Sequence, residues 1–256
     1  MQLDAGAIAQ GVRLVALASV GSTNKEARIR AQRGERAPLW VTAQEQTAGR
    51  GRMERSWDSP PGNLYASLLL REPSPYERAP ELAFVAAVAL RDAIVAESPA
   101  LAPELSFKWP NDVLLAGEKC AGILIEGEAG PAQQLAVVIG IGVNCVSHPP
   151  GATYPATDLR AHGADMTPER LFRRLSASMC RRIAQWDRGR GVVAILDDWR
   201  AAARGIGEAV SIRNGGREKC GRFVGLDPSG RLLLEVPGGG IERISAGDVF
   251  PFEIRV

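Results

Sequence analysis

The sequence predicts an α+β fold, in which a mixed, largely antiparallel sheet packs with helices and is followed by a small all-β unit. Three observations predict this class. Several strand-like segments follow one another without a helix between them, so the alternation of a doubly wound fold is absent. The Ala-rich apolar segment Pro80–Glu97 is typical of a helix that packs on a sheet. After residue 207, short β-like runs alternate with glycine-rich turns, as in a small barrel.

The first part of the chain is expected to contain three strands and a short helix. Thr23 is followed three residues later by Glu26, which is a capping-box pattern for a helix that reaches about Arg33. The flanking segments are rich in apolar and β-branched residues, which predicts strands. These strands are expected at Arg13–Val20, Leu39–Gln44 and Asn63–Leu70.

The middle of the chain is expected to continue with strands and then to become helical. Asp112–Leu115 and Cys120–Glu126 flank the turn sequence Ala-Gly-Glu-Lys, which indicates a hairpin. Residues 167–203 begin with Thr-Pro, a favourable helix start, and Gly189 and Gly191 are expected to divide this segment into two helices. Two further strands are expected at Leu105–Trp109 and Leu135–Val143.

A domain boundary is expected near Gly205–Gly207, which divides the chain into residues 1–206 and residues 207–256. Five short β-like runs follow this boundary, separated by Asn-Gly-Gly, Asp-Pro-Ser-Gly and Pro-Gly-Gly-Gly. The runs are Ala209–Arg213, Arg222–Leu226, Arg231–Val236, Glu242–Ser245 and Asp248–Ile254.

Composition disfavours several functional classes. The net charge of +2 gives no bulk reason to expect a nucleic-acid binder. Four scattered cysteines argue against a metal knuckle or a redox pair and fit a reducing compartment. No signal-peptide pattern is present, and the longest apolar stretch, Leu82–Val95, is interrupted by Arg91 and Asp92. We therefore expect a soluble, cytoplasmic protein without a membrane segment. The cysteines are Cys120, Cys145, Cys180 and Cys220.

A Gly/Arg-rich segment is the first candidate for ligand binding. Residues 49–52 read Gly-Arg-Gly-Arg and are followed by Arg55 and Trp57. Glycines let the backbone approach a ligand closely, and arginines bind phosphate or carboxylate with forked hydrogen bonds. A nearby tryptophan can stack on an adenine ring. The alternative is a solvated basic loop, or a segment that binds RNA.

A lysine-containing hairpin is the second candidate. Residues 108–112 read Lys-Trp-Pro-Asn-Asp, and Lys119 follows eleven residues after Lys108. Two lysines and Asp112 thus come together around the hairpin. Such a set can hold phosphates with a bridging Mg²⁺, because oxygen ligands suit that ion. The alternative is a proline-containing turn with ordinary surface charges.

Two polar segments are weaker candidates. Residues 22–24 read Ser-Thr-Asn and cap a predicted helix, where small polar side chains could also bind an uncharged head group such as a ureido ring. Asn144 ends an apolar strand, so its amide could either read an adenine edge or bond the backbone at the strand end.

Several common catalytic motifs are absent from the sequence. It contains no Walker loop, no G-x-S-x-G elbow and no H-E-x-x-H motif, and neither His148 nor His162 has a triad context. A histidine-based hydrolase is therefore disfavoured, and any ATP is not held by a P-loop.

Taken in order, these segments closely resemble the catalytic domain of biotin protein ligases over residues 15–150. The quoted segments are STN, QTAGRGR with WDSPPGNLY, KWPND with KCAGILIE, and GIGVN. The resemblance implies a class II synthetase-like catalytic domain followed by an SH3-like β-barrel. It also implies an enzyme that uses ATP, biotin and Mg²⁺ to form biotinyl-5′-AMP. That enzyme would transfer biotin to one lysine of a biotin carboxyl carrier protein domain.

The resemblance also implies individual roles. Lys119 and Arg52 would be catalytic, because charge develops on phosphate oxygens in both steps. Asp112 would be a metal ligand. Biotin would be bound by Ser22, Thr23, Asn24, Gln46, Arg50, Gly51, Arg52, Lys119 and Gly122. ATP would be bound by Arg52, Arg55, Trp57, Lys108, Asn111, Lys119 and Asn144.

The chain departs from the family at Met53-Glu54, where Arg-Gly is frequent, and an acid here could weaken ATP binding or change the order of the loop. Only 21 residues precede Ser22, which is too few for the N-terminal helix-turn-helix of some family members. We therefore expect a monofunctional enzyme, monomeric or homodimeric, that does not act on DNA.

Two alternatives remain. A lipoate or octanoate ligase or transferase acts on similar carriers, but it needs a long apolar tunnel, and the transferases lack an ATP site. A non-enzymatic RNA-binding module would use the Arg/Gly loop and the β-rich tail, but the small net charge and few aromatic residues disfavour it.

Overall fold

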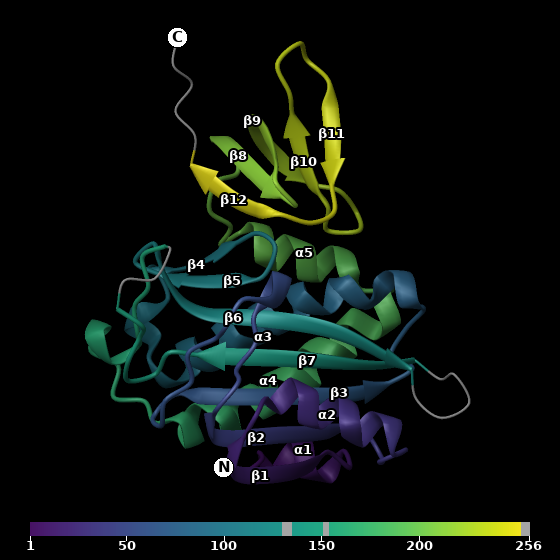
Figure 1. Cartoon of the computed structure of the whole chain (residues 1–256), viewed down its shortest axis with the longest axis vertical. Coiled ribbons are helices and arrows are strands. Elements are labelled where there is room, and N and C mark those ends of the chain that lie inside the picture. The colour runs from purple at the N-terminus through teal and green to yellow at the C-terminus, as the bar shows by residue number, and fades with distance from the viewer. Residues whose placement is uncertain (130–134, 151–153, 252–256) are drawn as a thin grey trace.

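The main body of the protein is a seven-stranded mixed sheet. The computed structural model describes residues 1–129, 135–150 and 154–251, and Figure 1 shows the strands side by side, from β1 at the bottom to β4 at the top. Among the described pairs, β1 and β2 are parallel and all other neighbours are antiparallel, which confirms the predicted fold class. In spatial order the strands are β1 (Arg13–Val20), β2 (Leu39–Gln46), β3 (Leu64–Arg71), β7 (Leu135–Val143), β6 (Glu118–Ala129), β5 (Asp112–Leu115) and β4 (Leu105–Lys108).

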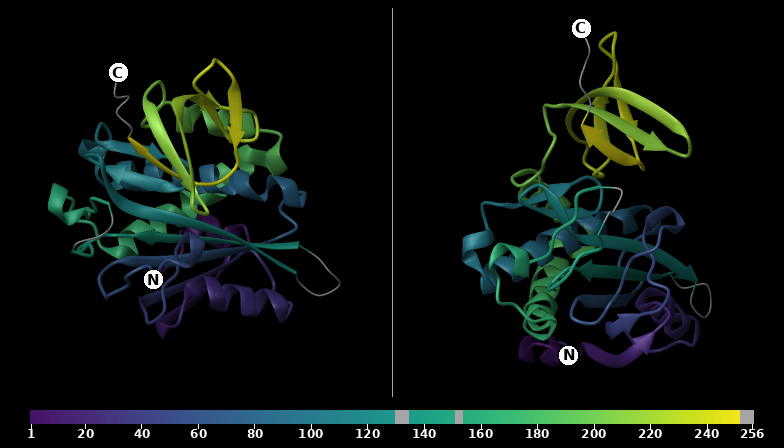
Figure 2. Two further views of the ribbon diagram at one scale, coloured as in Figure 1. Left: turned by 45° about the horizontal axis from the view of Figure 1, so that its top comes forward. Right: turned by 60° about the vertical axis from the view of Figure 1, so that its left-hand side comes forward.

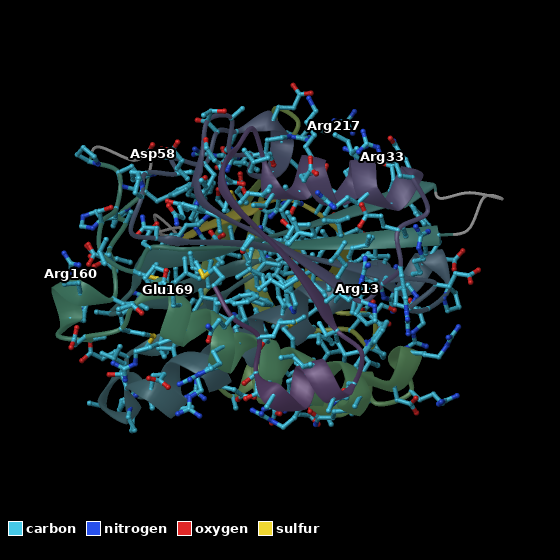
Figure 3. The ribbon with its side chains drawn as sticks, turned by 90° about the horizontal axis from the view of Figure 1, so that it is seen from below. Arg13, Arg33, Asp58, Arg160, Glu169 and Arg217 are labelled. Carbon is cyan, nitrogen blue, oxygen red and sulfur yellow. The ribbon has the colours of Figure 1, made fainter. Side chains whose placement is uncertain are left out.

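Helices cover both faces of this sheet. Helix α2 (Thr23–Gln32) lies on one face, whereas α3 (Leu82–Glu97) and α4 (Pro168–Trp186) lie on the other, with α2 and α4 on opposite sides in Figure 3. Helix α5 (Val192–Arg200) packs against α3 and α4, and the short α1 (Ala5–Ala9) packs against α4. None of the described helices is long and apolar enough to cross a lipid bilayer. Short 3₁₀ helices lie at Arg52–Glu54, Tyr76–Glu81, Pro99–Leu101, Arg160–His162 and Asp187–Gly189.

The two faces of the sheet differ in what they bury. Ile139 and Ile141 of β7 belong to the large core beneath α3 and α4, whereas Val138 belongs to a small core beneath α2. Because side chains alternate along a strand, Gly140 and Gly142 face the same side as Val138. The sheet therefore carries no side chains at these positions on its α2 side, which lets other side chains approach its backbone closely.

A second sheet of five antiparallel strands follows the helices. Figure 2 shows it beyond the β4 edge of the main sheet, where Trp109 Nε1 donates a hydrogen bond of 3.0 Å to the carbonyl of Gly230. The predicted all-β unit is thus confirmed, whereas a domain division between residues 206 and 207 stays a prediction. In spatial order the strands are β11 (Ile241–Ile244), β10 (Leu232–Glu235), β9 (Arg217–Leu226), β8 (Ala209–Asn214) and β12 (Asp248–Pro251).

Several predicted boundaries need correction. Ser22, not Thr23, is the N-cap of α2, because its side chain accepts from the Lys25 amide. The helix predicted from Pro80 starts as a 3₁₀ turn and becomes α-helical at Leu82. Strand β9 begins at Arg217 rather than Arg222. The first residues of this strand are polar and exposed, so they show no apolar pattern in the sequence. Ile254, the predicted end of the last strand, lies outside the described residues. The remaining predicted strands and the split of the helical segment at Gly189 and Gly191 agree with the structure within a few residues.

Candidate active site

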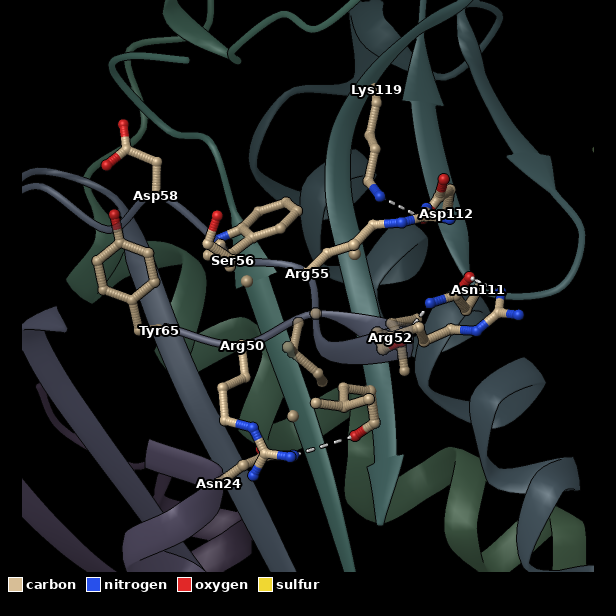
Figure 4. Close-up of a pocket in the computed structure, with 18 of the residues that line it drawn as sticks. Asn24, Arg50, Arg52, Arg55, Ser56, Asp58, Tyr65, Asn111, Asp112 and Lys119 are labelled. Carbon is tan, nitrogen blue, oxygen red and sulfur yellow. Dashed lines mark hydrogen bonds and ion pairs between the residues drawn. The ribbon is translucent and has the colours of Figure 1, made fainter. Parts of the chain in front are cut away.

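A cavity of about 450 Å³ lies on the α2 side of the main sheet, a size suited to a small-molecule ligand. Its walls come from the β1–α2 turn, the Arg-rich loop and the β5–β6 hairpin, and strand β7 forms its floor. Figure 4 shows these segments around the cavity. Every site residue predicted from the sequence lines it except Lys108. The predicted residues on its wall are Ser22, Thr23, Asn24, Gln46, Arg50, Gly51, Arg52, Arg55, Trp57, Asn111, Asp112, Lys119, Gly122 and Asn144.

One end of the cavity is lined by the uncharged polar side chains of Thr23, Asn24 and Gln46. Thr23 donates from its backbone N–H (2.8 Å) and its hydroxyl (3.0 Å) to Oε1 of Gln46. The Gln46 amide in turn donates 2.9 Å to Ser59 Oγ, and Ser59 donates to the Trp57 carbonyl. Thr23 and Asn24 are each only 4% exposed. This network fixes the direction of the buried polar groups, as their burial requires.

Ser67 on β3 lies behind this end of the cavity, where it contacts two of the lining residues, and it was missed by the sequence analysis. Its Oγ lies 2.6 Å from Asn24 Oδ1 and 2.8 Å from Thr23 Oγ1. Gly140 lies directly beneath, because a Cβ at this position would come within 2.1 Å of Asn24 Oδ1. The available signal was the strand period, which puts Ser67 and Tyr65 on the face opposite the large core.

The other end of the cavity is cationic. Arg52 Nη1 donates 2.9 Å to Asn111 Oδ1, and its Nη2 donates 3.1 Å to the carbonyl of Gly247. Burial lowers the pKa of Arg52, and the nearby Asp248 opposes this shift. Arg55 pairs with Asp248 and also donates to Tyr154. Arg52 and Arg55 are thus held by a residue of the second sheet.

Lys119 faces the same space as these arginines. Its Nζ lies 2.7 Å from Oδ1 of Asp112 and 5.4 Å from the centre of the Trp57 ring. The Trp57 ring lies against the bare floor, because a Cβ on Gly142 would come within 2.7 Å of Trp57 Nε1. The indole N–H is buried and has no hydrogen-bond partner among the described residues. Stacking of Trp57 on adenine stays a prediction.

The loop that carries these arginines is strained at the residues that depart from the family pattern. Met53 and Glu54 have φ of 53° and 59°, in the left-handed region where side chains are disfavoured. A glycine would adopt this conformation without the clash of a Cβ. The Arg52 and Arg55 contacts on either side hold the strained turn in place.

Residues 17–144 match the Biotin/lipoate A/B protein ligase family, and residues 205–250 match the Biotin protein ligase C terminal domain. The chain belongs to the biotin/lipoate A/B protein ligase family. A biotin–[acetyl-CoA-carboxylase] ligase of Paracoccus denitrificans is 43% identical over 242 residues, covering 91% of this chain and 98% of that relative. The bifunctional ligase/repressor BirA of Bacillus subtilis is 33% identical, covering 90% of this chain and 71% of the relative. The predicted resemblance to biotin protein ligases is therefore confirmed.

The fold agrees with this assignment. The structure of a biotin protein ligase from Aquifex aeolicus in complex with biotin and ATP has a TM-score of 0.78 and 25% identity, with 93% of this chain and 97% of that chain covered. The predicted enzyme class, a biotin–protein ligase, is confirmed with the family, and the non-enzymatic RNA-binding alternative is not supported.

Lys108 is the predicted site residue of this ligase that lies outside the cavity wall. Its ammonium group lies over two rings, 5.0 Å from the centre of Tyr154 and 5.2 Å from that of Phe250. Burial lowers its pKa. Because β4 is an edge strand beside the second sheet, its end directs the side chain to Phe250 of that sheet rather than into the cavity. A contact of Lys108 with the triphosphate stays a prediction.

The two asparagines predicted to bind ATP make structural bonds in this family member. Asn111 Nδ2 donates a 2.5 Å hydrogen bond to the carbonyl of Ile123, and its Oδ1 accepts a hydrogen bond from Arg52 Nη1. Asn144 Nδ2 donates 3.0 Å to the carbonyl of Thr157, which is the backbone-bonding alternative considered for it. Both residues still line the cavity, so binding of ATP by them stays a prediction.

Proposed function

We propose that this ligase condenses biotin with ATP to biotinyl-5′-AMP and pyrophosphate, and then transfers biotin to one lysine of a biotin carboxyl carrier protein. One observation carries this proposal: a single cavity contains an uncharged polar pocket at one end and Lys119, Arg52 and Arg55 at the other. The first end suits a neutral ring with hydrogen-bonding groups, and the second suits phosphates.

The polar end favours biotin over lipoate. Asn24 and Thr23 are buried, Gln46 is half-buried, and all three make hydrogen bonds at this end of the cavity. A ureido ring offers two N–H donors and one carbonyl acceptor, so it can pair with such groups. A dithiolane ring offers no strong partner and would leave buried polar atoms unsatisfied, which costs free energy.

In the first step, a biotin carboxylate oxygen attacks the α-phosphorus of ATP. The bond from this phosphorus to the oxygen that bridges the α- and β-phosphates breaks, and pyrophosphate leaves with that electron pair. Lys119 and Arg52 would stabilise the negative charge on the phosphate oxygens from fixed positions. Without a ligand, Lys119 pairs with Asp112. An incoming phosphate would replace Asp112 as the partner of Lys119.

In the second step, the carrier lysine attacks the carbonyl of the mixed anhydride in its neutral amine form. The carbon–oxygen bond to AMP breaks, AMP leaves with the electron pair, and the amine loses a proton. No covalent intermediate with the enzyme is required. The adenylate hydrolyses readily in water, so the loop around Arg50 and Arg52 would cover it.

A magnesium ion fits this site as a companion of the triphosphate. Among the described residues no group of three or more His, Cys, Asp or Glu side chains is arranged to hold a metal ion. Asp112 Oδ1 is nevertheless buried without a well-formed hydrogen bond, although Lys119 lies close, and Asp248 also lines the cavity. One or two carboxylates with phosphate oxygens are a usual magnesium environment. When bound, the ion would neutralise charge on the leaving pyrophosphate.

The expected compartment and partner follow from chemistry and from the relatives. All four cysteines are free thiols, as in a reducing cytoplasm where ATP is available. The Paracoccus relative is described as a ligase of acetyl-CoA carboxylase, so a carrier domain of that carboxylase is the partner to test first.

The decisive experiment combines the protein with a carrier domain, MgATP and either biotin or lipoate. We expect the mass of one biotin on one carrier lysine, only when both protein and ATP are present. Modification with lipoate but not biotin would replace the proposal with lipoate ligation. Failure of both acids, measured also as absent pyrophosphate release, would contradict the proposal.

A further inference from the structure

Glu126 on β6 is a mostly buried carboxylate that is not part of the cavity wall and contacts three side chains. Its side chain is 14% exposed. Oε2 accepts a 2.8 Å hydrogen bond from Asn24 Nδ2, and Oε1 lies 3.1 Å from Arg28 Nη1 and 3.4 Å from Arg50 Nη1. Figure 4 shows the Arg50 ion pair beside Asn24. One carboxylate on β6 thus contacts both α2 and the Arg-rich loop.

The contact with Asn24 sets which end of this amide faces the cavity. Asn24 Nδ2 donates to Glu126 and, at 3.4 Å, to the carbonyl of Leu124. Oδ1 therefore lies over Gly140, beside the hydroxyl of Ser67. A flipped amide would turn its oxygen toward the Glu126 carboxylate, which is repulsive. The Glu126 oxygen that accepts from Nδ2 thus leaves Oδ1 of Asn24 to accept from the ligand.

The contact with Arg50 fastens the loop. Arg50 begins the strained turn, and its backbone forms an isolated bridge with Ser56, so its position determines where the turn starts. The Arg50 side chain is 40% exposed, which makes this ion pair weaker than the Asn24 hydrogen bond. The loop is thus tied by a weak contact to the residue that orients the head-group pocket.

We propose that Glu126 is a positioning residue that couples head-group binding to closure of the Arg-rich loop, without touching the ligand. The inference rests on the proposed function. A hydrogen-bond donor on the ligand pairs with Oδ1 of Asn24. This pairing favours the amide orientation in which Nδ2 donates to Glu126, and so strengthens the Asn24–Glu126 contact. The same carboxylate then retains Arg50 over the ligand, so biotin binding and loop order are thermodynamically linked.

Two substitutions separate the two contacts. Glu126→Gln keeps an oxygen that can accept from Asn24 but removes the charge that holds Arg50. Glu126→Ala removes both contacts. The matched control is Glu128→Gln on the same strand, which loses the 2.6 Å pair with Arg28 farther from the cavity.

The readouts are the biotin KM, the kcat for carrier modification, the free adenylate released, and tryptic cleavage after the loop arginines with and without biotin. We expect Glu126→Gln to release about two- to fivefold more free adenylate, as for a partly exposed ion pair, and to lose biotin protection of the loop. Its biotin KM should stay near that of the wild type. Glu126→Ala should also raise the biotin KM about tenfold, through the lost charged hydrogen bond. Glu128→Gln should match the wild type.

The proposal is overturned if Glu126→Gln keeps both adenylate retention and biotin protection of the loop. It is also overturned if Glu128→Gln gives the same changes, since the effect would then belong to Arg28. Thermal unfolding of each variant verifies folding, and Glu126→Gln carries the test alone if Glu126→Ala unfolds. A wild-type protein that binds no biotin would instead remove the proposed function, and this inference with it.

Discussion

Lys119 and Asp112 form an ion pair in which Nζ lies 2.7 Å from Oδ1, between the facing strands β5 and β6. Both side chains are mostly buried, at 20% and 14% exposure. An isolated buried ammonium would be costly, and Asp112 offsets this cost by pairing with Lys119 at the cavity wall. The pair therefore prepares a cation for the α-phosphate at a fixed position.

The first prediction is that Lys119→Ala abolishes adenylate formation. Removing one preorganised charge donor should lower the rate by about a hundred- to a thousandfold, since Asp112 is also left as an uncompensated charge facing the phosphates. Biotin-dependent exchange of pyrophosphate into ATP measures this step. Lys25→Ala, at an exposed position of α2, is the matched control and should be normal. Near-normal exchange in Lys119→Ala would remove Lys119 from the mechanism.

The second prediction is that Arg52→Ala forms adenylate but leaks it. Arg52 ties the loop to Asn111 and to the carbonyl of Gly247, the residue just before β12, so its loss should leave the intermediate open to water. We expect the ratio of free biotinyl-AMP to biotinylated carrier to rise several-fold when both are quantified in one reaction. Arg33→Ala, exposed at the end of α2, serves as control. An unchanged ratio would show that Arg52 has no retention role.

Local patterns were sufficient for most of the fold, whereas the full set of site residues came from the resemblance to biotin protein ligases. Gly140 and Gly142 stand two residues apart in an apolar strand, and this spacing alone puts both on one face, which lines the cavity. Arg52 and Lys119 lie on a loop and a hairpin with clear signals, and they line the same cavity.

The residues that were missed depend on contacts between distant segments. Asp248 pairs with Arg55 across 193 positions, so no local pattern could connect them. Lys108 was placed correctly at a strand end, but a strand end does not reveal whether the side chain turns to a cavity or to a neighbouring sheet. Ser22 rather than Thr23 caps α2 because Gln46 and Ser67 bind the Thr23 hydroxyl, which again is a tertiary effect.

The third prediction concerns the space above Gly140. A Cβ here would lie 2.1 Å from Asn24 Oδ1, so Gly140→Ala must push the amide out of its place. We expect the biotin KM to rise about tenfold or more, because a buried hydrogen-bonding group is displaced. Gly127→Ala on β6 is the matched control, since its Cβ would meet Tyr76 at an ordinary 3.4 Å. Equal biotin KM values for both variants, measured by initial rates, would contradict the role given to Asn24.

The last prediction is an alkaline loss of stability caused by two buried thiols. Burial raises the pKa of Cys120 and of Cys145 from 9.0 to about 12 in each case. Above pH 9.0 the unfolded thiols ionise while the folded ones stay protonated, so the folded state binds more protons and its stability falls as pH rises toward 12. Each thiol should contribute a slope of about 1.4 kcal/mol per pH unit in this window and nothing well below it.

Substitution isolates this contribution from other alkaline effects, because only the slope is compared. Urea unfolding at a series of pH values should give Cys120→Ala and Cys145→Ala a smaller loss of stability above pH 9.0 than the wild type, although the cavity they create lowers stability at every pH. In the native protein at neutral pH, both thiols should resist a thiol reagent that modifies them rapidly after unfolding, because a buried protonated thiol is a poor nucleophile. Parallel pH profiles for the wild type and both variants would show that these thiols ionise equally in the folded and unfolded states.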